Sequence, residues 1–156
     1  MSNLQVVDVT EVLYQELSEL SALDTGSTAT NWRLESLAKS FTSGSQMIKI
    51  TVNDCLSGYC LYRDVDSEAE ILNFVIAEPR RRQGLGKILL TRLIDNLQRI
   101  TPGKIWLEVR KNNVPAQKLY ESLGFKQVGV RSNYYRTSHG SDSSCREDAL
   151  VFCKEI

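Results

Sequence analysis

One stretch of the sequence decides the fold: residues 71–97, ILNFVIAEPRRRQGLGKILLTRLIDNL. It opens inside an almost unbroken apolar segment, Ala69 to Ala77, which is typical of a central β-strand buried on both faces. A turn containing Gly84 and Gly86 follows, and then a run whose leucines and isoleucines repeat at helical spacing. A buried strand, a glycine turn and an amphipathic helix in this order predict an α/β fold with a binding site at the turn.

Further strands and helices are expected on both sides of this stretch. Alternating or apolar runs predict strands, and apolar residues three or four positions apart predict helices. Strands are expected at residues 4–9, 46–52, 55–62, 69–77, 104–110, 125–135 and 147–154. Helices are expected after the capping residues Thr10 and Asn31, after the glycine turn, and from Asn113 to Leu123. The order βααβββαβαββ predicts a mixed sheet flanked by helices, in a single domain covering residues 1–156.

Composition excludes several kinds of protein. The chain has 156 residues, 42% of them hydrophobic, which suits one domain with its own core. Its 19 basic and 19 acidic residues leave no net charge, whereas nucleic-acid binders carry a basic excess. The four cysteines form no CxxC pair and His139 is the only histidine, so we expect no metal site. With no signal peptide and no apolar run of about 20 residues, we expect a cytoplasmic protein that does not enter membranes.

The turn Arg81-Arg82-Gln83-Gly84-Leu85-Gly86 has the chemistry of a phosphate site. The first amides of a helix lack partners within the helix, glycines let a phosphate approach the backbone, and the helix dipole favours negative charge. On these grounds alone, the turn could equally be a plain connection with solvated arginines. A Walker loop is excluded because Lys87 is followed by Ile88. A dinucleotide fingerprint is excluded because Leu89 stands where a third glycine or alanine is required.

Three polar residues beyond the turn are candidates for chemistry. Glu108 lies within an otherwise apolar strand, on the face that it shares with Trp106. Tyr120 lies in the apolar stripe of a helix, and its phenol stays protonated at neutral pH. Asn113 stands where that helix begins. Each residue also has an ordinary interpretation: a strand face open to water for Glu108, a core position for Tyr120, and an N-cap for Asn113.

The spacing RxxGxG resembles the acetyl-CoA signature of the GCN5-related N-acetyltransferase (GNAT) family, and the order of elements matches that family from end to end. Within it, the chain is similar to the bacterial enzymes that acetylate the N-terminal alanine of the eighteenth small-subunit ribosomal protein. The similar segments are Leu107-Glu108-Val109-Arg110, Asn113, Leu119 to Phe125, Arg131, Asn133-Tyr134-Tyr135, Arg146-Glu147-Asp148-Ala149 and, near the N-terminus, Trp32.

This resemblance implies a GNAT fold, with a splayed pair of strands, and acetyl-CoA as the acetyl donor. It implies that Glu108 is the general base and Tyr120 the general acid. It assigns the peptide substrate to Trp32, Asn133, Tyr134 and Tyr135. It assigns the cofactor to the strand before the turn, the turn and the next helix start: Phe74, Val75, Ile76, Arg81, Arg82, Gln83, Gly84, Leu85, Gly86, Lys87 and Asn113.

Three functions stay open at this stage. The favoured one is acetylation of a ribosomal protein N-terminus by a monomer or a weak dimer. The others are acetylation of a small-molecule amine and a non-catalytic acyl-CoA-binding module that regulates a partner. The presence of both Glu108 and Tyr120 argues against the module. The chain departs from the enzymes it resembles at Arg136, in a longer loop at 137–145 and beside Trp32, so its peptide preference could differ.

Overall fold

The computed structural model describes residues 3–9, 14–24, 34–100, 103–136 and 145–156. Its strands are β1 (Leu4–Val9), β2 (Gln46–Val52), β3 (Cys55–Val65), β4 (Glu68–Ile76), β5 (Lys104–Arg110), β6 (Lys126–Arg136) and β7 (Arg146–Glu155). Its helices are α1 (Tyr14–Asp24), α2 (Leu34–Thr42), α3 (Leu85–Ile100) and α4 (Val114–Ser122), with a short 3-10 turn η1 (Glu78–Arg80). The predicted order of strands and helices is confirmed.

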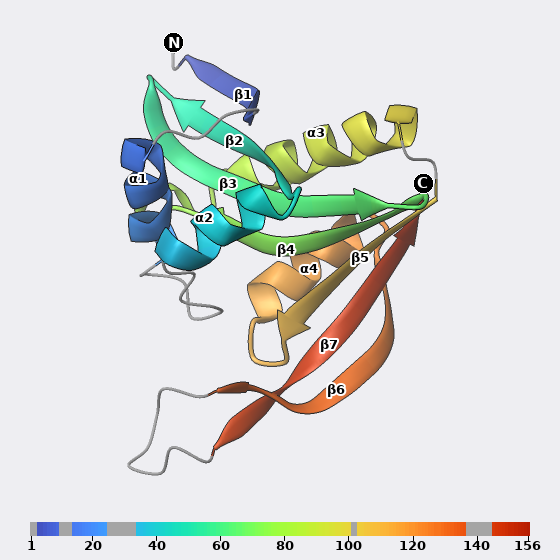
Figure 1. The fold of residues 1–156 in the computed structure, drawn as a ribbon. Helices are drawn as coiled ribbons and strands as arrows, with labels where there is room; N and C mark the ends of the chain where they lie inside the picture. Colours follow the sequence, from blue (N-terminus) through green and yellow to red (C-terminus); the bar gives the residue numbers. More distant parts are fainter. Residues whose placement is uncertain (1–2, 10–13, 25–33, 101–102, 137–144) are drawn as a thin grey trace.

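The strands form one mixed sheet in the order β1-β2-β3-β4-β5-β7-β6. Neighbouring strands are antiparallel except β4 and β5, which run parallel because α3 connects them. Helices α1 and α2 lie over one face of the sheet and α3 and α4 over the other, while the β6–β7 hairpin projects beyond the layers (Figure 1). The predicted mixed α/β sheet is therefore confirmed.

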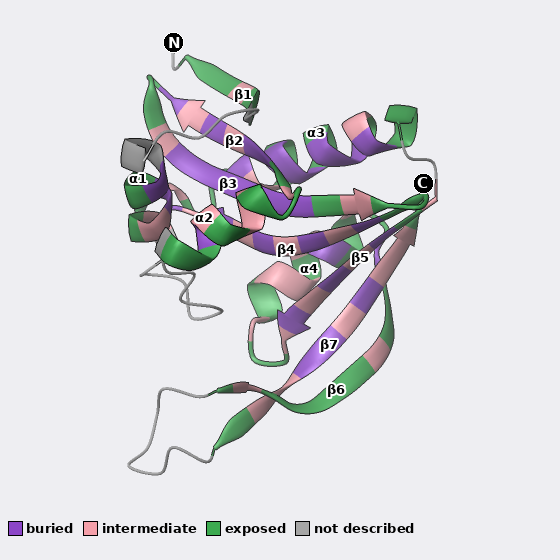
Figure 2. Ribbon diagram, viewed as in Figure 1, coloured by how far each residue is buried: buried purple, intermediate pink, exposed green. Residues whose placement is uncertain are grey.

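Two apolar layers hold the helices to the sheet. The larger lies under α3 and α4, and α3 contributes Leu85, Leu89, Leu90, Leu93, Ile94 and Leu97. The smaller lies under α1 and α2, which contribute Leu17, Leu20 and Leu37. Each such leucine stabilises the fold by about 1.5–3 kcal/mol when it is buried. Figure 2 shows these buried stripes and the largely exposed β6. Within the described residues, no helix is both long and apolar enough to cross a membrane.

The β3–β4 hairpin differs from the expected pattern. Strand β3 continues three residues beyond the predicted end at Tyr62, because Arg63 pairs with Glu70 across the ladder and a tight turn at Asp66 and Ser67 follows. Both turn residues have positive φ, 49° and 69°. In the first half of β4, Ala69 and Ile71 are buried under α3 and α4, whereas Glu68 and Glu70 lie on the opposite face and line an open trough. The expectation of burial on both faces is therefore wrong for its first half, where its side chains alternate between the core and an open trough.

Strands β4 and β5 pair only over their first halves. Within the described residues their ladder runs from Glu68 opposite Lys104 to Ile71 opposite Leu107, and then the strands fan apart (Figure 1). The divergence begins where a β-bulge interrupts the ladder between β3 and β4, skipping Leu72. A bulge bends its strand and strengthens its twist. The bulge therefore turns the second half of β4 away from β5, and the splayed pair implied by the family resemblance is confirmed.

Candidate active site

The glycine turn adopts backbone conformations that side chains disfavour. After η1 the chain passes through Arg82, with φ of 63°, and Gly84, with φ of 82°, before α3 begins at Leu85. The first α-helical bond of the turn runs from the Ile88 amide to the Gly84 carbonyl, at 3.1 Å. The amides that precede Ile88 on α3 have no acceptor within the helix. They face the region where an anion is favoured by the helix dipole.

A cavity of about 520 Å³ opens at this helix start. It is bounded by the second half of β4, the glycine turn and the beginning of α4. The lining residues are Phe74, Val75, Ile76, Arg80, Arg81, Arg82, Gly84, Leu85, Gly86, Lys87, Asn113, Pro115, Ala116 and Leu119. The structure thus brings together all the predicted cofactor residues except Gln83, whose amide donates to the Pro79 carbonyl at 3.0 Å.

The cavity fits a phosphate-bearing ligand with a narrow arm. A Cβ added at Gly86 would lie 3.2 Å from Leu119 Cδ2 and 3.6 Å from both Phe74 Cζ and Ile76 Cγ1, so a side chain there would narrow the passage. Arg80, Arg81, Arg82 and Lys87 surround the helix start with positive charge. Arg81 also braces the turn, because its Nε donates to the Ile76 carbonyl at 3.1 Å.

The splay exposes one backbone edge of β4 to this cavity. Phe74, Val75 and Ile76 remain paired with β3 but have no partner on β5 in the described ladder. Because N–H and C=O groups alternate between the two edges of a strand, some of those at 74–76 point toward the open side. These groups need acceptors and donors from a ligand or from water. They are suited to an extended amide-containing chain.

Asn113 is the N-cap of α4 and also lies at the cavity, where the contact with a cofactor stays a prediction. Its Oδ1 accepts a hydrogen bond from the Ala116 amide at 3.3 Å, so it caps α4. It also lines the cavity. The cap fixes the start of α4 next to the splayed strands. Any contact between Asn113 and a ligand is made from this fixed position.

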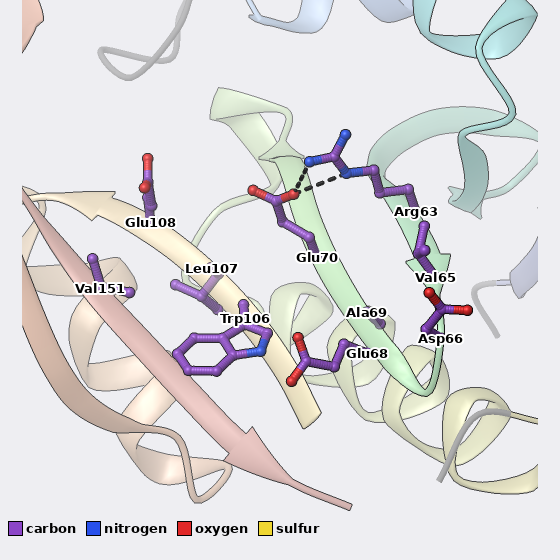
Figure 3. Close-up of a pocket in the computed structure, with 10 residues that line it drawn as sticks. All are labelled: Arg63, Val65, Asp66, Glu68, Ala69, Glu70, Trp106, Leu107, Glu108 and Val151. Carbon is purple, nitrogen blue, oxygen red and sulfur yellow. Dashed lines mark hydrogen bonds and ion pairs between the residues drawn. The ribbon is translucent and has the colours of Figure 1, made fainter. Parts of the chain in front are cut away.

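Glu108 lies on the opposite face of the sheet, at the edge of an open trough. The trough has a volume of about 730 Å³ and is lined by Arg63, Val65, Asp66, Glu68, Ala69, Glu70, Trp106, Leu107, Glu108 and Val151 (Figure 3). Glu70 and Glu108 rise from the same face, whereas Ile71 and Leu107 face the core beneath α3. The Glu108 side chain is 22% exposed, and its Oε1 accepts from Arg131 Nη1 at 2.5 Å. Glu108 is thus a surface carboxylate at the point where β5 leaves β4.

Tyr134 and Tyr135 stand beside Glu108. Their rings meet edge to face at 5.0 Å, Arg131 lies 4.2 Å from the Tyr134 ring, and Arg110 lies 4.5 Å from the Tyr135 ring. Burial, the charge of Glu108 and a hydrogen bond with its carboxylate all raise the pKa of Tyr134. Burial and the charge of Glu108 raise the pKa of Tyr135 to about 12. Both phenols are therefore protonated at neutral pH, and the Tyr134 hydroxyl donates its hydrogen bond to Glu108.

The other predicted substrate residues have different surroundings. Asn133 is exposed, has a positive φ of 54°, and donates its amide to Asp148 Oδ1 at 3.0 Å. It lies where the register between β6 and β7 shifts, and it sets the direction of the following tyrosines. Trp32 and the loop at 137–144 lie outside the described residues.

Tyr120 is a core residue beside the cofactor cavity. It is 5% exposed, and its ring packs against Phe74, Phe125 and Phe152 at centroid distances of 6.3, 5.9 and 6.2 Å. Burial raises its pKa far above the ordinary value near 10, and the neighbouring Cys60 and Tyr135 add to this effect. Phe74 is the shared wall, because it lines the cavity and also contacts Tyr120.

The sequence did not lead us to expect the trough, and it gave Arg131 no role at the site. Glu68 and Glu70 alternate with the buried Ala69 and Ile71, which signals a strand with one polar face. This alternation does not reveal which strand lies next to β4. Only the assembled sheet shows that Glu70 of β4 is paired with Trp106 of β5.

A cavity at a helix start beside a splayed strand pair is the arrangement that the resemblance to acyl-CoA-dependent acetyltransferases implied. Residues 11–125 match the family model described as the Acetyltransferase (GNAT) family. The chain therefore belongs to the GNAT family of acetyltransferases, which use acetyl-CoA as the acetyl donor.

Similar proteins with more specific names cover most of the chain. The [ribosomal protein bS18]-alanine N-acetyltransferase of Salmonella typhimurium is 32% identical over 90% of this chain and 99% of its own length. The Escherichia coli protein of the same name is 39% identical over 69% of this chain and 70% of its own length. The crystal structure of the E. coli ribosomal-protein-S18-alanine N-acetyltransferase superposes with a TM-score of 0.81 at 30% identity, covering 100% of this chain and 94% of the other.

Proposed function

We propose that this protein transfers the acetyl group of acetyl-CoA directly to the N-terminal α-amine of alanine in ribosomal protein bS18. The observation that carries the proposal is the position of Glu108, a carboxylate at the splay whose trough lies opposite the cofactor cavity. An amine and a thioester entering from the two faces would meet at this point. The substrate itself is proposed from the names of relatives that align over nearly the whole chain. We place the reaction in the cytoplasm, where ribosomal proteins are synthesised.

In this proposal Glu108 is the general base. A protein N-terminal amine has a pKa of about 7.7–8.0, against about 10.4 for lysine, so a carboxylate suffices to accept its proton, directly or through a water molecule. In the tyrosine pair next to Glu108, Tyr135 offers a hydroxyl donor to a carbonyl of an extended peptide, and Tyr134, whose hydroxyl bonds with Glu108, offers its oxygen as an acceptor. Trp32 is assigned to the same peptide contact.

Tyr120 is the proposed general acid. When bound, acetyl-CoA supplies the acetyl group and a sulfur leaving group. Because burial keeps the Tyr120 phenol protonated, its hydroxyl can donate a hydrogen bond to that sulfur as negative charge develops on it, which stabilises the departing thiolate. The amides of β4 near Phe74 supply donors for the carbonyl oxygen as negative charge develops on it.

A second function, acetylation of a small polyamine, is supported by one observation. The trough contains four carboxylates, those of Asp66, Glu68, Glu70 and Glu108. Arg63 pairs with Glu70 at 2.5 Å and Arg131 pairs with Glu108, so two of the four already have a cation beside them. This partial neutralisation favours a peptide amine over a chain of several ammonium groups.

A competition between substrates tests the proposal. The enzyme and acetyl-CoA are given a peptide with the first residues of bS18, matched peptides beginning with Met or Ser, an N-terminally blocked peptide that retains lysine, and spermidine. We expect kcat/KM to be highest for the alanine peptide and product to be absent from the blocked peptide. A higher kcat/KM for spermidine would overturn the peptide proposal, and acetylation of the blocked peptide would overturn selectivity for the α-amine.

A further inference from the structure

The ion pair between Glu108 and Arg131 spans three strands. Strand β7 separates β5 from β6, and Val151 of β7 lies directly opposite Glu108. Arg131 itself lies opposite Ala149, so its side chain reaches diagonally across β7 to place Nη1 2.5 Å from Glu108 Oε1. Contacts that cross an intervening strand require a side chain held in one direction.

Aromatic packing holds Arg131 in that direction. Its guanidinium lies 4.2 Å from the Tyr134 ring, which packs edge to face on Tyr135, and Tyr135 in turn packs against Arg110. Arg110 is fixed by Glu147 at 3.4 Å. The chain Arg131–Tyr134–Tyr135–Arg110–Glu147 therefore links the carboxylate of Glu108 to the loop end of the β6–β7 hairpin. A planar guanidinium suits both ends of such an arrangement, since it can stack and donate at once.

The groups that face Glu108 explain why it needs a fixed partner. Tyr134 and Tyr135 of β6 and the positive Arg131 face it from one side, and the carboxylate of Glu70 on β4 shares its trough on the other. An exposed pair of this kind contributes only about 0–1 kcal/mol to folding. A displacement of about 1 Å in a reacting group, by contrast, can cost about a hundredfold in rate. The pair therefore matters for the position of the carboxylate far more than for stability.

We propose that Arg131 is a positioning residue that orients the Glu108 carboxylate toward the incoming amine. This inference rests on the proposed role of Glu108 as the base. Arg131 is not among the described residues that line the cavity at the start of α3. Its loss should therefore slow the chemical step and leave acetyl-CoA binding intact.

The variant Arg131→Met removes the charge and keeps an unbranched side chain. We expect kcat to fall about tenfold to a hundredfold, with the KM for acetyl-CoA unchanged. Arg131→Lys should restore only part of the loss, because an ammonium retains the charge but lacks the planar group that packs on Tyr134. Lys126→Met, which removes an exposed cation at the start of the same strand, is the matched control and should retain full activity. Urea unfolding checks that each variant is folded.

A double-mutant cycle separates positioning from a structural role. If Arg131 acts through Glu108, then Arg131→Met added to Glu108→Gln should cause no further loss of kcat. Independent, multiplying losses would overturn the inference, and so would an Arg131→Met variant as active as Lys126→Met. Full activity of Glu108→Gln alone would instead overturn the proposed base, so failure of the inference and failure of the proposed function give different results.

Discussion

Gly84 and Gly44 form a natural pair for testing the cofactor turn. Gly84 has φ of 82° and Gly44, just after α2, has φ of 85°, and a Cβ at either position would meet no atom within 4 Å. Replacing either by alanine adds backbone strain without a collision. The left-handed conformation costs an L-residue about 1–2 kcal/mol. We expect Gly84→Ala and Gly44→Ala to lower the free energy of unfolding by this amount, measured by urea denaturation.

Only Gly84→Ala should also weaken cofactor binding. Relief of the strain would rotate the turn and re-aim the amides of Leu85 and Gly86, which begin α3. A hydrogen bond to a charged group contributes about 1.5–3 kcal/mol, so the loss of one such bond lowers affinity about tenfold to a hundredfold. The assay is isothermal titration calorimetry with acetyl-CoA. Equal affinities for the Gly84 and Gly44 variants, at equal loss of stability, would refute the assignment of this turn to the cofactor.

Three further predictions concern the chemistry and its pH dependence. Glu108→Gln should lower kcat about 10²–10⁴-fold in peptide assays without changing acetyl-CoA affinity, because Glu108 lies on the face opposite the cofactor cavity. Tyr120→Phe should lower kcat in the same assay while keeping the three aromatic contacts, so that the free energy of unfolding changes by only about 1 kcal/mol. Tyr135 has a pKa of about 12 when folded, above its usual 10. Its contribution to stability is therefore complete below pH 10 and is lost as pH rises toward 12. Urea unfolding at pH 9 and at pH 11 gives the measurement. The free energy of unfolding should fall less between these two pH values in Tyr135→Phe than in the parent protein.

Each of these predictions has an outcome that contradicts it. An unchanged kcat in Tyr120→Phe would remove the general acid, whereas a collapse in stability would mean only that the hydroxyl supports the core. Equal losses of stability between pH 9 and 11, with and without the Tyr135 hydroxyl, would show that its ionisation is not linked to unfolding. For Glu108→Gln, a weakened acetyl-CoA affinity would show that the carboxylate supports the cofactor side of the sheet.

Local periodicity predicted most of the elements because it depends on near neighbours in the chain. The strands Gln46–Val52 and Lys104–Arg110 have the expected bounds, and the α3 stripe faces the core as its spacing requires. Gly124 takes the left-handed conformation, with φ of 85°, directly after the helix that was expected to end at Leu123. The periodicity of strands and helices is visible within two to four residues, and the conformation of the glycine follows from backbone sterics. Neither depends on residues far away in the chain.

The glycine turn between β4 and α3 was also predictable, because its parts are contiguous in the sequence. Its phosphate chemistry follows from glycines, arginines and a helix start within six residues. Recognition of its particular ligand came from the family resemblance, since a glycine turn before a helix serves several anions. The bulge at Leu72, which turns β4 away from β5, left no local signal.

The sequence by itself determined the order of the elements, the amphipathic α3 and the anion-binding turn before it, because each depends on short-range spacing. Tertiary structure alone decided that Glu70 would lie beside Glu108 and that Arg131 would reach across β7 to the same carboxylate. The physical reason is that contacts between strands depend on the order and register of the sheet, which arise from pairing between residues far apart in the chain. The turn proposed to bind the cofactor is a local feature of the chain, whereas the geometry around Glu108 exists only once the seven strands of the sheet have paired.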